Sequence, residues 1–238
     1  MDVDRIHKQL SHFIARHHVE FAELPRIQTQ LLELGAMTLA AEHYRLHDYT
    51  IEPSNLIEGR FRVKVTSRGD PWNYSWFTVR RRGKCFEIHS NLTVLGAYGL
   101  DGGRYVVDVA VTQPDTVPRI RREENKKFAL PNECLSTFVE AKKLVVYPML
   151  LAQFVGIVHE ILPGFLSGLP RGFAPQGHFR PALVSTGYPA GTSRDIINGF
   201  VNRGFRICVI PHFDVSLAGM TRGIAERSPF DPPHNVTA

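Results

Sequence analysis

Three charged residues stand out because they lie in or beside strongly apolar sequence. Asp108 lies inside the run YVVDVAV, and Glu140 and Lys142 follow Val139 in the next apolar stretch. A carboxylate that is buried alone costs several kcal/mol of folding free energy, even after its surroundings relax. We therefore expect Asp108 to be compensated by an arginine, by hydrogen bonds or by a metal ion.

The spacing of Glu140 and Lys142 places both side chains on the same face of a strand, from which they can converge with Asp108 at one end of a sheet. Two carboxylates suit Mg²⁺, which also binds substrate phosphate. Such an ion lowers the pKa of a bound water, and a nearby lysine can orient that water or stabilise developing negative charge. The pattern favours Mg²⁺-assisted hydrolysis of a phosphodiester, with Mn²⁺ as a possible substitute. The alternative is a buried ion pair between Asp108 and Lys142, with Glu140 at a solvent-facing strand end.

The elements that must position these residues follow from hydrophobic periodicity. The strand at 105–111 is apolar at nearly every position, so we expect it to be central in its sheet. The late strand–helix–strand order predicts an α/β (α+β) fold with a mixed central sheet flanked by helices. We expect helices at 4–18, 25–46, 147–162 and 193–202, strands at 49–51, 60–65, 74–80, 85–94, 105–111, 135–139, 181–186 and 205–210, and a loop at 112–133.

Asp108, followed at a distance by Glu140-Ala141-Lys142, resembles the signature of the PD-(D/E)XK nuclease superfamily, and the order of elements over 25–210 is similar to its restriction-endonuclease-like core. The resemblance implies that Asp108 and Glu140 bind Mg²⁺ with the Ala141 carbonyl, and that Lys142 acts on the nucleophilic water. It also implies a nuclease domain over 25–226. Residues 1–24 would be an N-terminal helical extension and residues 227–238 a flexible tail.

Two positions in this pattern have alternatives. Valine, not proline, precedes Asp108, and the pair Pro114-Asp115 also fits the spacing. We prefer Asp108 because it lies in a predicted strand beside that of Glu140, whereas Asp115 lies in the predicted loop. Many superfamily members add a glutamate from the first core helix. Glu33 and Glu42 are the candidates here, and the leucines that flank Glu33 favour it.

Basic residues concentrate in the predicted strands between positions 60 and 84. This stretch holds eight lysines and arginines and a single acid, Asp70, whereas the whole chain carries a net charge of +5. Concentrated basic charge with interleaved aromatic rings is typical of a nucleic-acid-binding face. The alternative is a solvated strand face with core aromatics. The predicted nucleic-acid-binding residues are Arg60, Arg62, Lys64, Trp72, Trp76, Arg80, Arg81, Arg82 and Lys84.

Composition narrows the remaining possibilities. The three cysteines are far apart, which argues against a disulfide scaffold or a cysteine-rich zinc module, and we expect none of the eleven histidines to bind a metal. The polar N-terminus and the lack of a long apolar run predict a cytoplasmic protein without a membrane span.

We expect a metal-dependent DNA endonuclease that acts on double-stranded DNA. The resemblance implies a restriction or anti-phage effector that is a homodimer or is regulated by a partner. The main alternative is a catalytically inactive module that binds nucleic acid or supports an assembly. A weaker alternative is an RNA nuclease, because the acidic residues and the lysine do not read the sugar.

Overall fold

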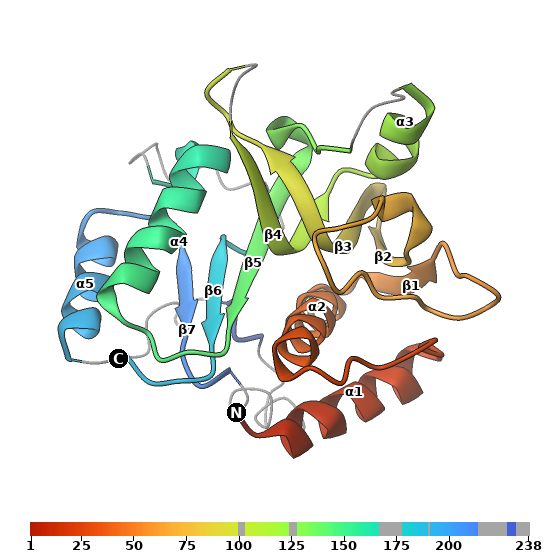
Figure 1. The fold of residues 1–238 in the computed structure, drawn as a ribbon, viewed down its shortest axis with the longest axis horizontal. Helices are drawn as coiled ribbons and strands as arrows, with labels where there is room; N and C mark the ends of the chain where they lie inside the picture. Colours follow the sequence, from red (N-terminus) through yellow and green to blue (C-terminus); the bar gives the residue numbers. More distant parts are fainter. Residues whose placement is uncertain (100–102, 124–127, 167–177, 190, 214–227, 232–238) are drawn as a thin grey trace.

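The computed structural model describes residues 1–99, 103–123, 128–166, 178–189, 191–213 and 228–231. Its seven strands form one sheet in the order β1-β2-β3-β4-β5-β6-β7 (Figure 1). Neighbouring strands are antiparallel from β1 to β5, and β5, β6 and β7 are parallel. The strands are β1 (Thr50–Ser54), β2 (Trp76–Arg81), β3 (Lys84–Leu95), β4 (Arg104–Thr112), β5 (Leu135–Lys142), β6 (Ala182–Ser185) and β7 (Cys208–Ile210).

Helices cover both faces of this sheet. The described helices are α1 (Val3–His17), α2 (Gln28–Leu46), α3 (Thr116–Glu123), α4 (Pro148–Ile161) and α5 (Gly191–Asn202). One core cluster joins α1 and α2 to one face, and a second joins α4 and α5 to the other (Figure 1). The predicted mixed α/β fold with flanking helices is therefore confirmed. Within the described ranges, no helix combines the length and the apolar character that a bilayer crossing needs.

The central position predicted for the 105–111 strand is confirmed, because β4 is the fourth of the seven strands. Its side chains supply both cores: Val109 and Val111 face the cluster that contains α2, whereas Ala110 faces the cluster that contains α4. Helix α2 is apolar on most of its circumference because it lies between the sheet and α1, and few of its positions face solvent.

Three stretches differ from the sequence-based expectation. Residues 60–65 form no strand of the sheet: Phe61 exchanges backbone hydrogen bonds with Glu20 and Ala22 in an isolated bridge. The predicted loop at 112–133 contains α3, which buries Val117 and Ile120 against the α4-side core. Strand β5 continues past 139 to Lys142, because its last residues pair in parallel with β6.

Both predicted terminal segments pack against the core where they are described. In α1, Ile6, Leu10 and Phe13 are buried in the same cluster as α2. In the stretch predicted as a flexible tail, Ser228 and Phe230 are buried, because the Phe230 ring stacks on Phe179 at 4.3 Å between ring centroids. Residues 227 and 232–238 lie outside the described residues.

Candidate active site

Asp108 lies where β4 and β5 separate. The last pair recorded between the two strands at this end is Val109↔Val139, one residue before Asp108 and Glu140 would meet. The Asp108 carboxylate occupies the opening, and its Oδ2 accepts a hydrogen bond of 2.8 Å from the backbone N–H of Ala141. The compensation expected for a buried acid is therefore present, in part from the backbone of the neighbouring strand.

Lys142 joins the two predicted acids. Its Nζ lies 3.0 Å from Asp108 Oδ2 and 2.8 Å from Glu140 Oε2. The buried ion pair between Asp108 and Lys142, which is the alternative interpretation of the sequence, is thus present. Glu140, however, is only 3% exposed and does not lie at a solvent-facing strand end. The structure brings Asp108, Glu140 and Lys142 together as the sequence predicted.

Glu140 is the most deeply buried acid of the group. The pKa of its carboxyl is raised to about 7: burial is the largest cause, the negative charges of Asp108 and Glu33 add to it, and the contact with Lys142 opposes them. Within the described residues, its Oε1 is buried and has no hydrogen-bond partner. A buried carboxylate oxygen without a partner is costly, so this atom is suited to accept a cation or a proton.

Glu33 approaches the same place from α2. Its Oε2 accepts a hydrogen bond of 3.0 Å from Asn91 Nδ2. The charges of Asp108 and Lys142 both affect the pKa of its carboxyl. Burial is the main cause that raises the pKa of Glu33 to about 7; the Asp108 charge adds to it, while Asn91 and Lys142 lower it. We call Glu33, Asp108, Glu140 and Lys142 the acidic site.

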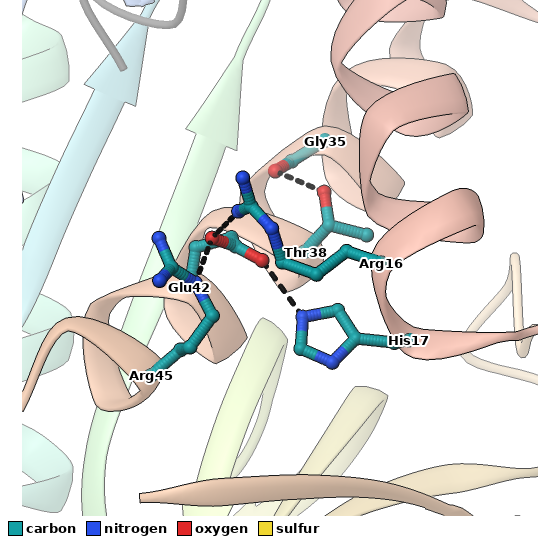
Figure 2. Close-up of polar contacts among 6 residues, drawn as sticks. All are labelled: Arg16, His17, Gly35, Thr38, Glu42 and Arg45. Carbon is teal, nitrogen blue, oxygen red and sulfur yellow. Dashed lines mark hydrogen bonds and ion pairs between the residues drawn. The ribbon is translucent and has the colours of Figure 1, made fainter. Parts of the chain in front are cut away.

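Glu42, the other candidate from the same helix, faces away from the acidic site. Its carboxylate is held by Arg16 and His17 of α1 and by Arg45 of its own helix (Figure 2). Burial raises the pKa of Glu42, but the hydrogen bonds from His17 and Arg45 and the charges of both arginines outweigh it and leave the pKa below its usual value. Glu42 therefore links α1 to α2, and of the two glutamates only Glu33 lies near Asp108.

Asp115 is also separate from the acidic site. Its side chain is 61% exposed and pairs with Arg122 at 2.6 Å, and its backbone N–H donates to Glu87 Oε1. Its φ of +58° belongs to the turn that leads into α3. Of the two aspartates that fit the sequence spacing, the structure places Asp108 beside Glu140.

Asn91 supports the acidic site and was not predicted from the sequence. It lies on β3 between Ser90 and Leu92, which pair with Val109 and Val107 on either side of Asp108. Its side chain donates to Glu33 and to the Lys64 carbonyl, and its φ of +51° is a left-handed conformation that asparagine tolerates. The sequence contains no distinctive signal for it, because Glu87, His89, Ser90 and Thr93 are also polar residues of the same strand.

The donor set fits Mg²⁺ or Mn²⁺. Two carboxylates, Asp108 and Glu140, contact one ammonium group, and the charge of Glu33 also acts on Glu140, which leaves an excess of negative charge. Glu140 Oε1 has no partner among the described residues. Hard oxygen ligands of this kind match Mg²⁺. The Ala141 carbonyl, which the resemblance adds to the ligands, belongs to the residue whose N–H contacts Asp108.

Three of the seven predicted basic residues pair with acids of neighbouring segments. Arg60 pairs with Glu20, Arg80 with Glu52 and Arg81 with Asp48. Arg62, Arg82 and Lys84 are exposed. Lys84 begins β3 seven residues before Asn91, which corresponds to about 24 Å along the strand. A ligand that contacts both the β2–β3 turn and the acidic site must be elongated.

Lys64 and Trp76 are buried, and Lys64 also lines a cavity that Arg68 and Arg104 share. Lys64 is 3% exposed, its Nζ donates to the Asn91 carbonyl at 2.8 Å, and burial lowers the pKa of its ammonium to about 8 against the opposing effect of Asp70. Trp76 is 8% exposed and packs on His89. Trp72 is half-buried, with Arg121 over its ring. For the two tryptophans, the alternative interpretation, in which the aromatic rings belong to the core, describes the structure better.

A cavity of about 380 Å³ is linked to the acidic site through Asn91, although the acidic-site residues themselves do not line it. Asn91, which holds Glu33, forms part of its wall, and the exposed residues Arg68 and Arg104 line it together with Asp70. Arg68 contributed to the basic charge counted in the sequence, but neither arginine was assigned a role. The two arginines place positive charge closer to the acidic site than the β2–β3 turn does.

A second cluster of possible ligands lies at the other end of α2. His43, His47 and Asp231 each offer one ligand atom, and these atoms lie within 4.8 Å of one another. Burial, and then the charge of His47, lowers the pKa of His43 to about 3 although Asp231 opposes the shift, so the ring is neutral at neutral pH. The sequence signal was available in the four-residue spacing of the two histidines, but Asp231 lies in the stretch predicted as a flexible tail.

The resemblance to the PD-(D/E)XK superfamily rests on the spacing of Asp108 and Glu140-Ala141-Lys142 and on the order of elements. A comparison of the chain with known proteins found no match among family models, curated proteins or solved structures. What the chain does is therefore inferred from its own residues.

Proposed function

We propose that this chain is a Mg²⁺-dependent nuclease that hydrolyses phosphodiester bonds of DNA, and that it acts as an endonuclease. The observation that carries the proposal is the excess of acids: Asp108 and Glu140 are buried and both contact the ammonium of Lys142, and Glu33 lies close enough for its charge to affect Glu140. A buried group with this charge balance favours an added cation. The same cation can bind the phosphate of a substrate.

Each residue of the acidic site has a role in this reaction. Asp108 and Glu140 would hold Mg²⁺ or Mn²⁺, with the Ala141 carbonyl beside them. When bound, the ion lowers the pKa of a water molecule and offsets negative charge on the phosphate. Lys142 orients the attacking water or stabilises charge on the phosphate oxygens. Glu33, held by Asn91, adds a third carboxylate that can bind a water of the ion's coordination shell or accept a proton.

The cavity supports a nucleic-acid substrate. Arg68 and Arg104 line it at the point where Asn91 links it to Glu33. Guanidinium groups bind phosphate oxygens well, and phosphate contacts position a nucleic acid without reading its sequence. A backbone phosphate bound here would lie beside the acidic site.

A cleavage assay tests the proposal. Supercoiled and linear plasmid DNA, single-stranded DNA and RNA are incubated with the full chain in Mg²⁺, Mn²⁺ or EDTA. We expect the supercoiled plasmid to be nicked or linearised with either ion and left intact in EDTA. Asp108→Asn, Glu140→Gln and Lys142→Met should each lower the rate by about 100-fold or more, because the first two remove a charged ligand of the ion and the third removes the ammonium that acts at the phosphate or the water.

Matched variants separate chemistry from folding. Asp115→Asn and Lys143→Met change the same residue types at exposed positions near in sequence to Asp108 and Lys142, and both should cut at the wild-type rate. Circular dichroism and the melting temperature show whether each variant is folded. Cleavage of RNA alone would contradict the DNA assignment. Metal-dependent cleavage that survives in Glu140→Gln and Lys142→Met would contradict the whole assignment.

A binding module without catalysis is the second candidate. The observation that favours it is the contact of Lys142 with both carboxylates, which resembles a self-sufficient structural ion pair. In that case the chain binds DNA in a mobility-shift assay and cuts no substrate with either ion. Binding would then depend on the arginines and not on Glu140.

A further inference from the structure

His43, His47 and Asp231 form a cluster that the proposed nuclease reaction does not use. His47 Nε2 lies 2.9 Å from Asp231 Oδ1, and His43 Nδ1 lies 3.7 Å from the same oxygen. The ligand atoms of the three residues all lie within 4.8 Å of one another. In a tetrahedral zinc site with bonds of about 2.0–2.2 Å, neighbouring ligand atoms are about 3.3–3.6 Å apart. Small movements of these side chains therefore suffice to surround one ion.

The local structure holds these residues in place. His43 and His47 are four residues apart at the C-terminal end of α2, so both lie on one face of the chain there. The His43 ring is 4% exposed and packs edge-on against Phe179 and Phe230. The packing of Phe230 in turn fixes the neighbouring Asp231.

We propose that His43, His47 and Asp231 bind one divalent transition-metal ion, with Zn²⁺ as the best fit, and that this ion fastens residues 228–231 to the end of α2. Imidazole nitrogens suit Zn²⁺, Ni²⁺ and Cu²⁺, whereas Mg²⁺ requires oxygen ligands. Three protein ligands leave a fourth position. The His47 side chain is 44% exposed and that of Asp231 26%, so a water molecule can reach this position.

The cluster is not a hydrolase triad, although Ser228 lies next to it. Ser228 Oγ lies 2.8 Å from His43 Nδ1, the nitrogen that also faces Asp231. A Ser-His-Asp triad requires the serine and the acid on opposite ring nitrogens, and an accessible serine. Ser228 is fully buried, so it serves as a hydrogen-bond partner of the ring.

The cluster is also separate from the acidic site. Glu33 and His43 are ten residues apart on α2, which corresponds to about 15 Å along the helix. The two sites share the helix but no ligand, and they select different ions. The proposal therefore does not depend on the proposed nuclease activity.

Zinc binding by the full chain tests this proposal, with any histidine tag removed. The protein is stripped with EDTA, exchanged into chelator-free buffer, titrated with Zn²⁺ by calorimetry and analysed for metal content after gel filtration. We expect one Zn²⁺ per chain and a higher melting temperature with Zn²⁺. His47→Ala and Asp231→Asn should weaken binding by at least about tenfold, because loss of even an outer-shell partner costs that much. Both side chains are partly exposed, so these variants should fold.

Two control variants make the result specific. His12→Ala removes an exposed histidine of α1, and Asp108→Asn alters the acidic site; both should bind one Zn²⁺ as the wild type does. Absence of stoichiometric Zn²⁺ in the wild type would overturn the proposal. Unchanged binding by His47→Ala and Asp231→Asn, or loss of binding in Asp108→Asn, would also overturn it, since the ion would then lie elsewhere.

Discussion

At the scale of single residues, Glu33 and Glu140 have the most informative environment. The pKa of each carboxyl is raised to about 7, mainly by burial, and nearby acids add to the shift. Near neutral pH these groups can therefore exchange a proton, which is the property that general acid–base catalysis needs. The same burial prepares them to bind a cation, because a cation removes the cost of their charge.

The raised pKa of Glu33 has a measurable effect on stability. The folded-state pKa lies above the ordinary value near 4.5, so its contribution is fully present below pH 4.5 and is lost as the pH rises through 7. His43 and His178, whose pKa values burial lowers, change stability in the opposite sense as the pH falls below about 6.5. The effect of Glu33 on the pH dependence of the free energy of unfolding is therefore isolated by measuring a Glu33 variant beside the wild type.

We expect Glu33→Gln to become more stable relative to the wild type as the pH rises from 5 to 8 in EDTA. Glutamine resembles the protonated carboxyl and does not ionise. Urea unfolding at several pH values measures the difference in the free energy of unfolding. Glu23→Gln, at an exposed position, should show no such trend. A constant difference for Glu33→Gln would show that Glu33 has an ordinary pKa.

At the scale of elements, the sequence predicted what repeats regularly and missed what depends on a distant partner. The apolar periods of α2, β4 and α4 located these elements to within a few residues. In α3, arginines and Pro118 obscure a pattern carried by only two buried apolar residues, Val117 and Ile120. Residues 60–65 alternate like a strand, but their partner is the irregular segment near Glu20.

In the candidate site, too, some residues were predictable from the sequence pattern and others depend on distant partners. Asp108, Glu140 and Lys142 were predictable because charge in an apolar strand is conspicuous and β4 and β5 are neighbours. Asn91 was not predictable, because its role depends on the opening between the strands and on the position of α2. The burial of Lys64 and Trp76 was not predictable either, since it depends on how residues 61–75 cross the molecule.

Glu42 forms polar contacts between α1 and α2, and their contribution to stability can be measured. Glu42→Ala removes hydrogen bonds to three side chains and should lower the free energy of unfolding by about 2 kcal/mol, since hydrogen bonds to charged groups contribute about 1.5–3 kcal/mol. Urea unfolding at pH 7 measures the loss.

Glu23→Ala, on the surface, should change stability by less than about 0.5 kcal/mol. The Glu42 contribution should fall as the solution is acidified, because its folded-state pKa is lowered. Equal stability of the two variants would contradict this account.

At the scale of the whole molecule, the modest net charge of +5 conceals an uneven distribution. Arg80 and Arg81, at the β1–β3 edge, are paired with acids from neighbouring segments. Arg68 and Arg104 instead line the cavity beside the acidic site. We therefore expect the main DNA contact to be near this cavity and not at the β2–β3 turn.

Salt dependence distinguishes the two surfaces. Arg68→Ala with Arg104→Ala should weaken DNA binding and reduce the slope of log K against log salt by about 2, close to one per lost phosphate contact. Fluorescence anisotropy with a labelled duplex and no divalent ion measures both quantities. The matched pair Arg81→Ala with Arg82→Ala should reduce the slope less. The opposite order would place the DNA at the β2–β3 turn.

The two ends of the sheet limit how copies of this chain can associate. Edge strand β1 contains Pro53, which has no N–H to donate, and β7 is only three residues long. Within the described residues, neither end offers a long row of unpaired backbone groups, which strand addition between molecules requires. A homodimer of the kind implied by the resemblance would therefore need contacts other than strand addition at these two described edges.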